Sequence, residues 1–217
     1  TGGNIETNKG STRVAALRGI TCKIKQGERI ALIGHNGAGK SSFLRMISGI
    51  YHPTSGGIEI NCEVHPMLQK NFLTGVELSG AQAAKAHYLL GNGKSTGFEQ
   101  FLDEIIEFTQ LGDFIHMPIK SYSQGMSSRL LFALYTSGSH DCLALDEGFG
   151  TGDAKFFNQA QKRLEKFILS TGTLILASHS DTLLQRFCNR GIVFSQGRII
   201  FDGELKNALS FYNKGNN

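Results

Sequence analysis

The spacing of apolar residues along the chain predicts a strand-rich first part. Alternation predicts one strand over 13–24, with a break near Arg18-Gly19, and a second over 29–33. The polar segment 25–28 between them contains a glycine and is expected to be a turn. A helix over about 40–49 and a short strand over 58–60 complete this part.

Helical periodicity replaces alternation from about Thr74 to Leu134. Within this block, Phe101, Leu102, Ile105 and Ile106 fall on one face of a helix and acidic residues fall on the other. The segment 89–97 holds three glycines and is expected to be a loop between helices. The block therefore predicts an all-helical insert.

Strands and helices alternate in the last part of the chain. Strands are expected over 142–145, 173–177, 191–194 and 198–201, and helices over about 154–169 and 181–188. This order indicates an α/β fold with a mainly parallel sheet covered on both faces. In such folds ligands bind at the carboxyl ends of the strands.

Composition and charge argue against several classes of function, including nucleic-acid binding and membrane spanning. The 217 residues are 40% hydrophobic and 18% charged, with a formal net charge of +4 and no basic run, so we expect no nucleic-acid partner. No apolar run approaches the roughly 18 residues of a membrane span, and no signal peptide is evident. The four cysteines are far apart, mostly among apolar neighbours, and form no C-x-x-C, as expected of buried reduced thiols in a cytosol.

One stretch carries a phosphate-binding pattern. Gly34-His35-Asn36-Gly37-Ala38-Gly39-Lys40-Ser41 fits G-x-x-x-x-G-K-[ST] and lies between an apolar strand and a predicted helix. Glycines let backbone N–H groups point inward at a polyphosphate, and the helix adds its positive end. Lys40 would bridge the β- and γ-phosphates, and the Ser41 hydroxyl would ligate Mg²⁺. The alternative is a chance match in a glycine-rich chain.

Two later strands end in groups that suit phosphoryl transfer. Strand 142–145 runs into Asp146 and Glu147, where Asp146 would support Mg²⁺ and Glu147 would activate water. An Asp-Glu turn after a strand is also common without such a role. The next strand leads to His179, which is either a structural histidine or a group that bonds the γ-phosphate.

A third pattern lies before the last predicted helix of the insert. Ser123 and Gly125 offer a hydroxyl and an unhindered backbone N–H where a helix begins near Met126. The simple interpretation is a Ser/Gly helix cap. The functional interpretation is a second phosphate site that faces a nucleotide held by another subunit.

Five motifs in order resemble the ATP-binding subunit of an ABC transporter over essentially the whole chain. They are the phosphate loop at 34–41, Ser-x-Gly-Met at 123–126, Leu-Asp-Glu at 145–147, Gly-Asp at 152–153 and Ser-His at 178–179. Details such as Tyr-Ser-x-Gly-Met and Gly-Asp-Ala resemble the subgroup that energises export of bacterial surface polysaccharides. Lipopolysaccharide O-antigen exporters are the nearest likeness, with capsule and teichoic-acid exporters nearby.

The resemblance implies a P-loop NTPase of ABC type, with a mainly parallel sheet core, an antiparallel N-terminal β part and an all-helical subdomain insert. Residues 1–217 would form a single ABC ATPase domain. Residues 1–73 and 135–217 would be the RecA-like core with its β subdomain, and 74–134 the helical subdomain. An N-terminal strand is expected to precede Thr1.

The resemblance also implies site roles. The catalytic residues would be Glu147 and His179, and the metal ligands Ser41, Gln69 and Asp146 for Mg²⁺. The residues expected to bind ATP are Gly34, His35, Asn36, Gly37, Ala38, Gly39, Lys40, Ser41, Ser42, Gln69, Ser123, Gly125, Met126 and Asp153.

The implied assembly is a head-to-tail homodimer around two ATP molecules. A separate integral-membrane permease would contact the polysaccharide and hold this subunit at the cytoplasmic face of the bacterial inner membrane. The chain departs from the family at Gln124, where a small residue is usual, and residues 1–16 contain no aromatic residue to stack on adenine. The competing hypotheses are a soluble ABC-type ATPase, which usually has tandem domains or long insertions, and a small-molecule kinase.

Overall fold

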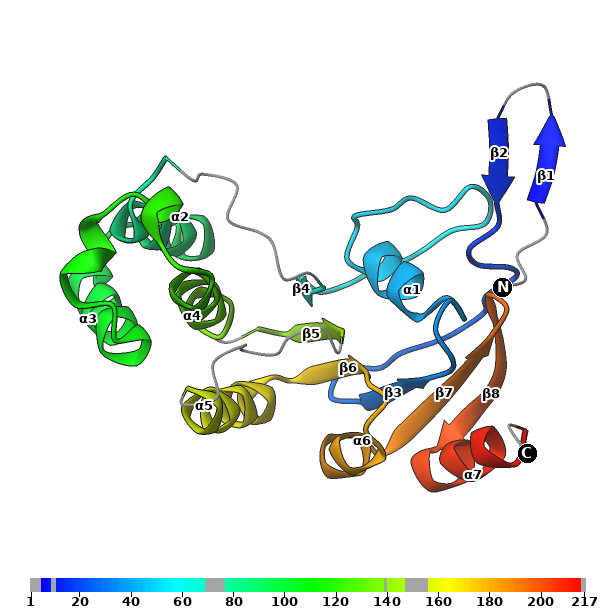
Figure 1. The fold of residues 1–217 in the computed structure, drawn as a ribbon. Coiled ribbons are helices and arrows are strands. Elements are labelled where there is room, and N and C mark those ends of the chain that lie inside the picture. Colours follow the sequence, from blue (N-terminus) through cyan, green and yellow to red (C-terminus); the bar gives the residue numbers. More distant parts are fainter. Residues whose placement is uncertain (1–4, 9–10, 69–76, 139, 147–155, 216–217) are drawn as a thin grey trace. The chain divides into compact units, whose positions relative to one another are not determined.

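The computed structural model describes residues 5–8, 11–68, 77–138, 140–146 and 156–215 (Figure 1). The chain divides into two compact units. The first comprises Thr1–Leu68, Ser139–Gly148 and Ile168–Asn217, and the second comprises Gln69–Gly138 and Phe149–Phe167. The sequence-based division, with 1–73 and 135–217 as core and 74–134 as insert, stays a prediction.

A six-stranded sheet forms the centre of the first unit. Its strand order is β4-β5-β6-β3-β7-β8, with the first five parallel and β8 antiparallel to β7. The strands are β3 (Arg29–Ile33), β4 (Val64–Met67), β5 (Cys142–Asp146), β6 (Thr173–Ala177), β7 (Arg190–Ser195) and β8 (Arg198–Glu204). The prediction of an α/β fold with a mainly parallel sheet is therefore confirmed.

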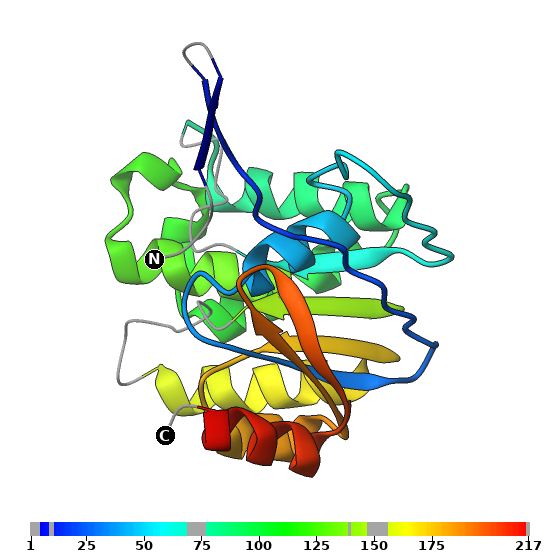
Figure 2. The same ribbon diagram turned by 90° about the vertical axis from the view of Figure 1, so that its right-hand side faces the viewer.

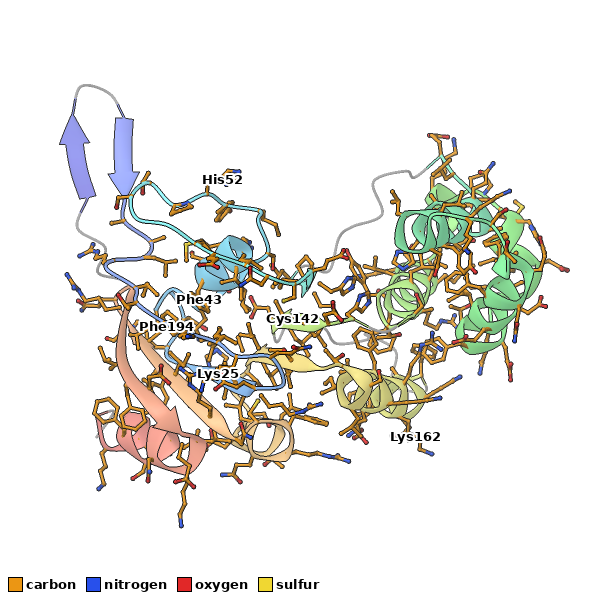
Figure 3. The ribbon with its side chains drawn as sticks, turned by 180° about the vertical axis from the view of Figure 1, so that it is seen from behind. Lys25, Phe43, His52, Cys142, Lys162 and Phe194 are labelled. Atoms are coloured by element: carbon orange, nitrogen blue, oxygen red, sulfur yellow. The ribbon has the colours of Figure 1, made fainter. Side chains whose placement is uncertain are left out.

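Helices cover both faces of this sheet, as Figures 1 and 2 show. Helix α1 (Lys40–Ile47) lies on one face, and α6 (Asp181–Phe187) and α7 (Leu205–Gly215) lie on the other. Under α1 the rings of Phe43 and Phe194 lie 5.4 Å apart (Figure 3). These apolar contacts fix α1, and with it the loop before α1, on the carboxyl end of β3.

The second unit is built from helices. It contains α2 (Gly80–Asn92), α3 (Phe98–Thr109), two short 3₁₀ helices (Gly112–His116 and Ile119–Ser121), α4 (Gln124–Tyr135) and most of α5 (Phe157–Ser170). Its buried core includes Ile105, Ile115 and Leu130. Arg163 from α5 lies 4.4 Å from the centroid of the Phe108 ring and donates to Glu104 at 2.8 Å. The all-helical character predicted for the insert is confirmed for these residues.

Two strand predictions in the first part of the chain are wrong. In place of a strand over 13–24, the chain pairs only Ile5–Asn8 (β1) with Ser11–Val14 (β2), in an antiparallel hairpin. The predicted strand over 58–60 does not form, because its two isoleucines stay 39% and 43% exposed and have no core to face. The turn at 25–28 is confirmed, with Gly27 at φ 84° and the Glu28 N–H donating to the Lys25 carbonyl.

Two further elements differ from the sequence prediction. The sequence pattern does not indicate strand β4, because β4 contains Pro66, which disfavours a strand assignment. β4 lies at the edge of the sheet, where one side of the strand has no partner. A proline without an N–H is therefore tolerated there. The loop predicted over 89–97 is shorter, since α2 continues to Asn92 and ends at Gly93, whose φ is 69°.

The described cysteines are free thiols, and Cys142 and Cys188 are buried. Burial raises the pKa of both thiols to about 12, which keeps them protonated near neutral pH. Cys62 is exposed, contrary to the expectation of burial.

Among the described residues, no helix is long and apolar enough to cross a membrane.

Helix α7 approaches β7 closely at Gly191, which gives a test of this packing. A Cβ at Gly191 would lie 2.5 Å from the Cβ of Ala208. We expect Gly191→Ala to destabilise the protein by about 1–3 kcal/mol, as overpacking does, and to lower the thermal midpoint by roughly 3–10 °C. Gly57→Ala is the control, because a Cβ there meets nothing within 4 Å. Equal midpoints for the two variants in a thermal scan would contradict this packing.

Candidate functional site

The loop between β3 and α1 is held in a path that requires glycine at both ends. Gly34 has φ 150°, and a Cβ there would lie 2.5 Å from the carbonyl oxygen of Phe194. Gly39 has φ 116°, and a Cβ there would lie 3.0 Å from Leu17 Cδ2. The Ala38 N–H donates to the His35 carbonyl, which closes the turn between them. The loop therefore curls directly onto the start of α1, whose first turn carries no acidic residue.

Lys40 is the first residue of α1, and its side chain folds back against the loop. Lys40 is only 8% exposed. Its Nζ donates to the carbonyl oxygen of Gly34 and, at 3.2 Å, to that of His35. These carbonyls stabilise a buried ammonium group, which would otherwise carry a large desolvation cost. The positive charge is thus fixed inside the loop that the sequence predicts for phosphate.

Ser41 and Asp146 meet at the same edge of the sheet. The Ser41 hydroxyl, in the first turn of α1, donates to Asp146 Oδ2 at 2.6 Å. Asp146 is the last residue of β5, two strands away from β3. A hydroxyl and a carboxylate in contact form an oxygen donor pair that suits a hard divalent cation such as Mg²⁺. The chemistry of these two residues therefore fits the predicted metal ligands.

His179 lies beside the loop as well. It follows β6, the strand adjacent to β3, and its Nε2 lies 3.0 Å from Asn36 Oδ1. The two residues are 143 positions apart in sequence, and the parallel pairing of β3 with β6 brings them together. The structure thus gathers Asn36, Lys40, Ser41, Asp146 and His179 at one edge of the sheet.

The remaining predicted residues of the loop follow the same path. Ala38 is buried and its carbonyl accepts from the Gly197 N–H at 2.9 Å. His35, Asn36 and Gly37 are exposed, and Ser42 lies in the first turn of α1. Gln69, Glu147 and Asp153 lie outside the described residues, so their predicted roles stay predictions.

The predicted second phosphate site belongs to the other unit and is described by itself. Ser123 is the N-cap of α4, and its Oγ accepts from the Met126 N–H at 3.2 Å. This is the helix-cap geometry that the simple interpretation of the motif predicts. Gln124 is exposed, and a Cβ at Gly125 would meet only Ser123 Oγ at 3.9 Å, so the surface at the start of α4 is open.

Sequence reasoning misses two segments, at Arg18 and at Gly197, whose backbone hydrogen bonds support the phosphate loop. The Arg18 N–H donates to the Gly197 carbonyl at 2.7 Å, and the Gly197 N–H donates to the Ala38 carbonyl. The sequence pattern predicts only a break in a strand near Arg18-Gly19 and a turn at Gln196-Gly197. Two pieces of chain far apart in sequence therefore hold the loop, and no local pattern marks them.

A curled glycine loop, an enclosed lysine, and a hydroxyl–carboxylate pair at the carboxyl edge of a parallel sheet define a class of protein. This is the P-loop class, which binds nucleoside triphosphates through their phosphates.

Comparison with known proteins specifies the family. A family model described as ABC transporter matches residues 17–150. The O-antigen export system ATP-binding protein RfbE of Yersinia enterocolitica is 38% identical over 92% of this chain and 84% of its own length. The teichoic acids export ATP-binding protein TagH of Staphylococcus haemolyticus is 33% identical over 96% of this chain and 78% of its own. The chain belongs to the ABC transporter family and is an ATP-binding, ATP-hydrolysing domain of that family.

Other relatives are longer than this chain. It spans 59% of the TagH protein of Listeria innocua, at 35% identity over 92% of the present sequence. Among solved structures, one described as the ATP-binding subunit of an ABC transporter has a TM-score of 0.71 at 21% identity, covering 95% of this chain and 89% of its own. At that identity the likeness concerns the fold alone.

The enclosed position of Lys40 predicts a direct role in nucleotide affinity. Loss of hydrogen bonds from a charged donor costs about 1.5–3 kcal/mol, so Lys40→Ala should weaken ATP binding by about 10- to 150-fold. Lys25→Ala is the charge-matched control, because Lys25 is exposed at the opposite end of β3. Fluorescent ATP titration measures both affinities, and equal affinities would contradict the role of Lys40.

Proposed function

We propose that this chain is the subunit that powers export of a polysaccharide across the inner membrane through a separate permease, with lipid-linked O-antigen as the best-supported cargo. The observation that carries the proposal is the gathering of Lys40, Ser41–Asp146 and His179 at the carboxyl edge of the sheet. The 38% identity to a protein named for O-antigen export supports the cargo.

The geometry of the first unit supports a division of labour in ATP hydrolysis. Backbone N–H groups of the loop would bind the phosphates, and the Lys40 ammonium would balance their charge. Ser41 and Asp146 would hold Mg²⁺, which supplies further charge neutralisation on the phosphates when bound. His179 would donate to a terminal phosphate oxygen. Glu147, the residue after Asp146, would orient the attacking water.

The open start of α4 supports a role in trans. Ser123 with Gly125 and Met126 would contact the terminal phosphate of an ATP molecule held by Lys40 of a second copy, as helix N-termini do with anions. Asp153 would lie at the contact between the two copies, and Gln69 would link the metal site to the permease. In this arrangement the protein acts at the cytoplasmic face of the inner membrane as a peripheral subunit.

Gene deletion in the host cell tests the transport function. We expect deletion to remove the polysaccharide from the cell surface while its lipid-linked precursor accumulates inside. Wild-type protein and the Lys25→Ala variant should restore export, and Lys40→Ala should not. Surface glycan is measured by antibody or lectin labelling, and the precursor by extraction of lipids. Unchanged surface glycan after deletion would contradict the proposal and favour a soluble ABC-type ATPase that is not coupled to transport.

A further inference from the structure

One polar contact at the nucleotide site is unexplained by the roles described so far. Asn36 Oδ1 and His179 Nε2 lie 3.0 Å apart, and both residues are exposed at the mouth of the loop. Exposed neutral hydrogen bonds contribute little to folding stability, because water competes for both groups. Stability alone therefore does not account for a contact between residues at two different strand ends.

Local hydrogen bonds constrain the backbone on both sides of the contact. On the loop side, the Ala38 N–H donates to the His35 carbonyl at 3.1 Å, and the Asn36 carbonyl oxygen lies 2.8 Å from His35 Nδ1. On the other side, Ser178 is buried, and its Oγ accepts from the Ser180 N–H at 3.0 Å. Both side chains thus project from constrained positions.

The contact between these two atoms determines which nitrogen of the imidazole carries a hydrogen. A carboxamide oxygen only accepts hydrogen bonds, so Nε2 of His179 must carry the hydrogen that joins it to Asn36 Oδ1. This contact selects a ring with a proton on Nε2 and directs that N–H over the phosphate loop. A terminal phosphate oxygen is also an acceptor, and it carries negative charge.

We infer that Asn36 is a positioning residue, whose carboxamide oxygen holds the Nε2–H of His179 until an oxygen of the γ-phosphate of ATP replaces it. The inference rests on the proposed function, since it takes ATP as the ligand. A charge-assisted hydrogen bond is roughly twice as strong as a neutral one, so the exchange favours phosphate. ADP lacks the γ-phosphate and leaves Asn36 as the acceptor. His179 therefore distinguishes ATP from ADP. After hydrolysis Asn36 again accepts the hydrogen bond from its Nε2–H.

Nitrogen NMR of histidine-labelled protein tests this inference directly. The chain has seven histidines, and His179→Gln identifies the signals of His179. In nucleotide-free protein we expect the Nε2 of His179 to be protonated. The Mg²⁺ complex of ADP should leave its signals in place, and that of a non-hydrolysable ATP analogue should shift them. An unprotonated Nε2 in the nucleotide-free protein would overturn the inference.

Two variants keep the branching and the number of side-chain heavy atoms of asparagine, and they differ in whether an acceptor oxygen remains. Asn36→Leu removes the acceptor, and Asn36→Asp keeps an oxygen in its place. Without nucleotide, Asn36→Leu should shift the His179 signals and Asn36→Asp should retain the Nε2–H bond. In ATPase assays Asn36→Leu should lower kcat about 3- to 10-fold, the effect of one positioning hydrogen bond, with a smaller change in KM.

The outcomes for Asn36 and for the proposed function are distinguishable. His179 signals that are the same in Asn36→Leu and wild type, without nucleotide, would overturn the positioning role whatever the protein does with ATP. Failure of the wild-type protein to bind the ATP analogue would instead contradict the proposed function, while the nucleotide-free comparison would still decide whether Asn36 holds His179. Circular dichroism of each variant verifies that it is folded.

Discussion

The backbone path of the loop between β3 and α1 is the constraint on which the nucleotide site depends. At Gly34 the loop passes so close to the Phe194 carbonyl that no side chain fits, and at Gly39 it turns into α1 with positive φ. The same path encloses the Lys40 ammonium against the carbonyls of Gly34 and His35. A loop that could relax at either glycine would lose both this backbone path and the enclosure of the positive charge.

The pairing register of the sheet brings Asp146 and His179 to the phosphate loop, although both lie far from the loop in sequence. Parallel pairing aligns the carboxyl ends of β5, β6 and β3, so that Asp146 reaches Ser41 and His179 reaches Asn36. The apolar contact of Phe43 with Phe194 holds α1 on this edge. Core packing, strand register and loop geometry therefore act together to place five polar side chains that come from three separate parts of the chain.

Much of this arrangement could be predicted from the sequence, because its determinants are local. The phosphate-loop pattern, the apolar strand before it and the strand ending at Asp146 each occupy a few consecutive residues, and alternation of strands and helices indicates a parallel sheet. The strand β4 could not be predicted, since Pro66 is tolerated only because β4 lies at the sheet edge. The support of the loop by Arg18 and Gly197 and the contact of Asn36 with His179 arise from tertiary packing. No local pattern encodes such pairs.

We propose that ATP held by Lys40 of one chain completes a site with the Ser123 end of α4 from a second chain. The most direct test is the solution mass of the Glu147→Gln variant, measured by light scattering with and without ATP and Mg²⁺. Glutamine in place of the proposed base should leave ATP binding intact and stop turnover, so we expect a monomer that becomes a dimer only with ATP. A mass that stays monomeric at saturating ATP, with binding verified by fluorescence, would contradict the proposal.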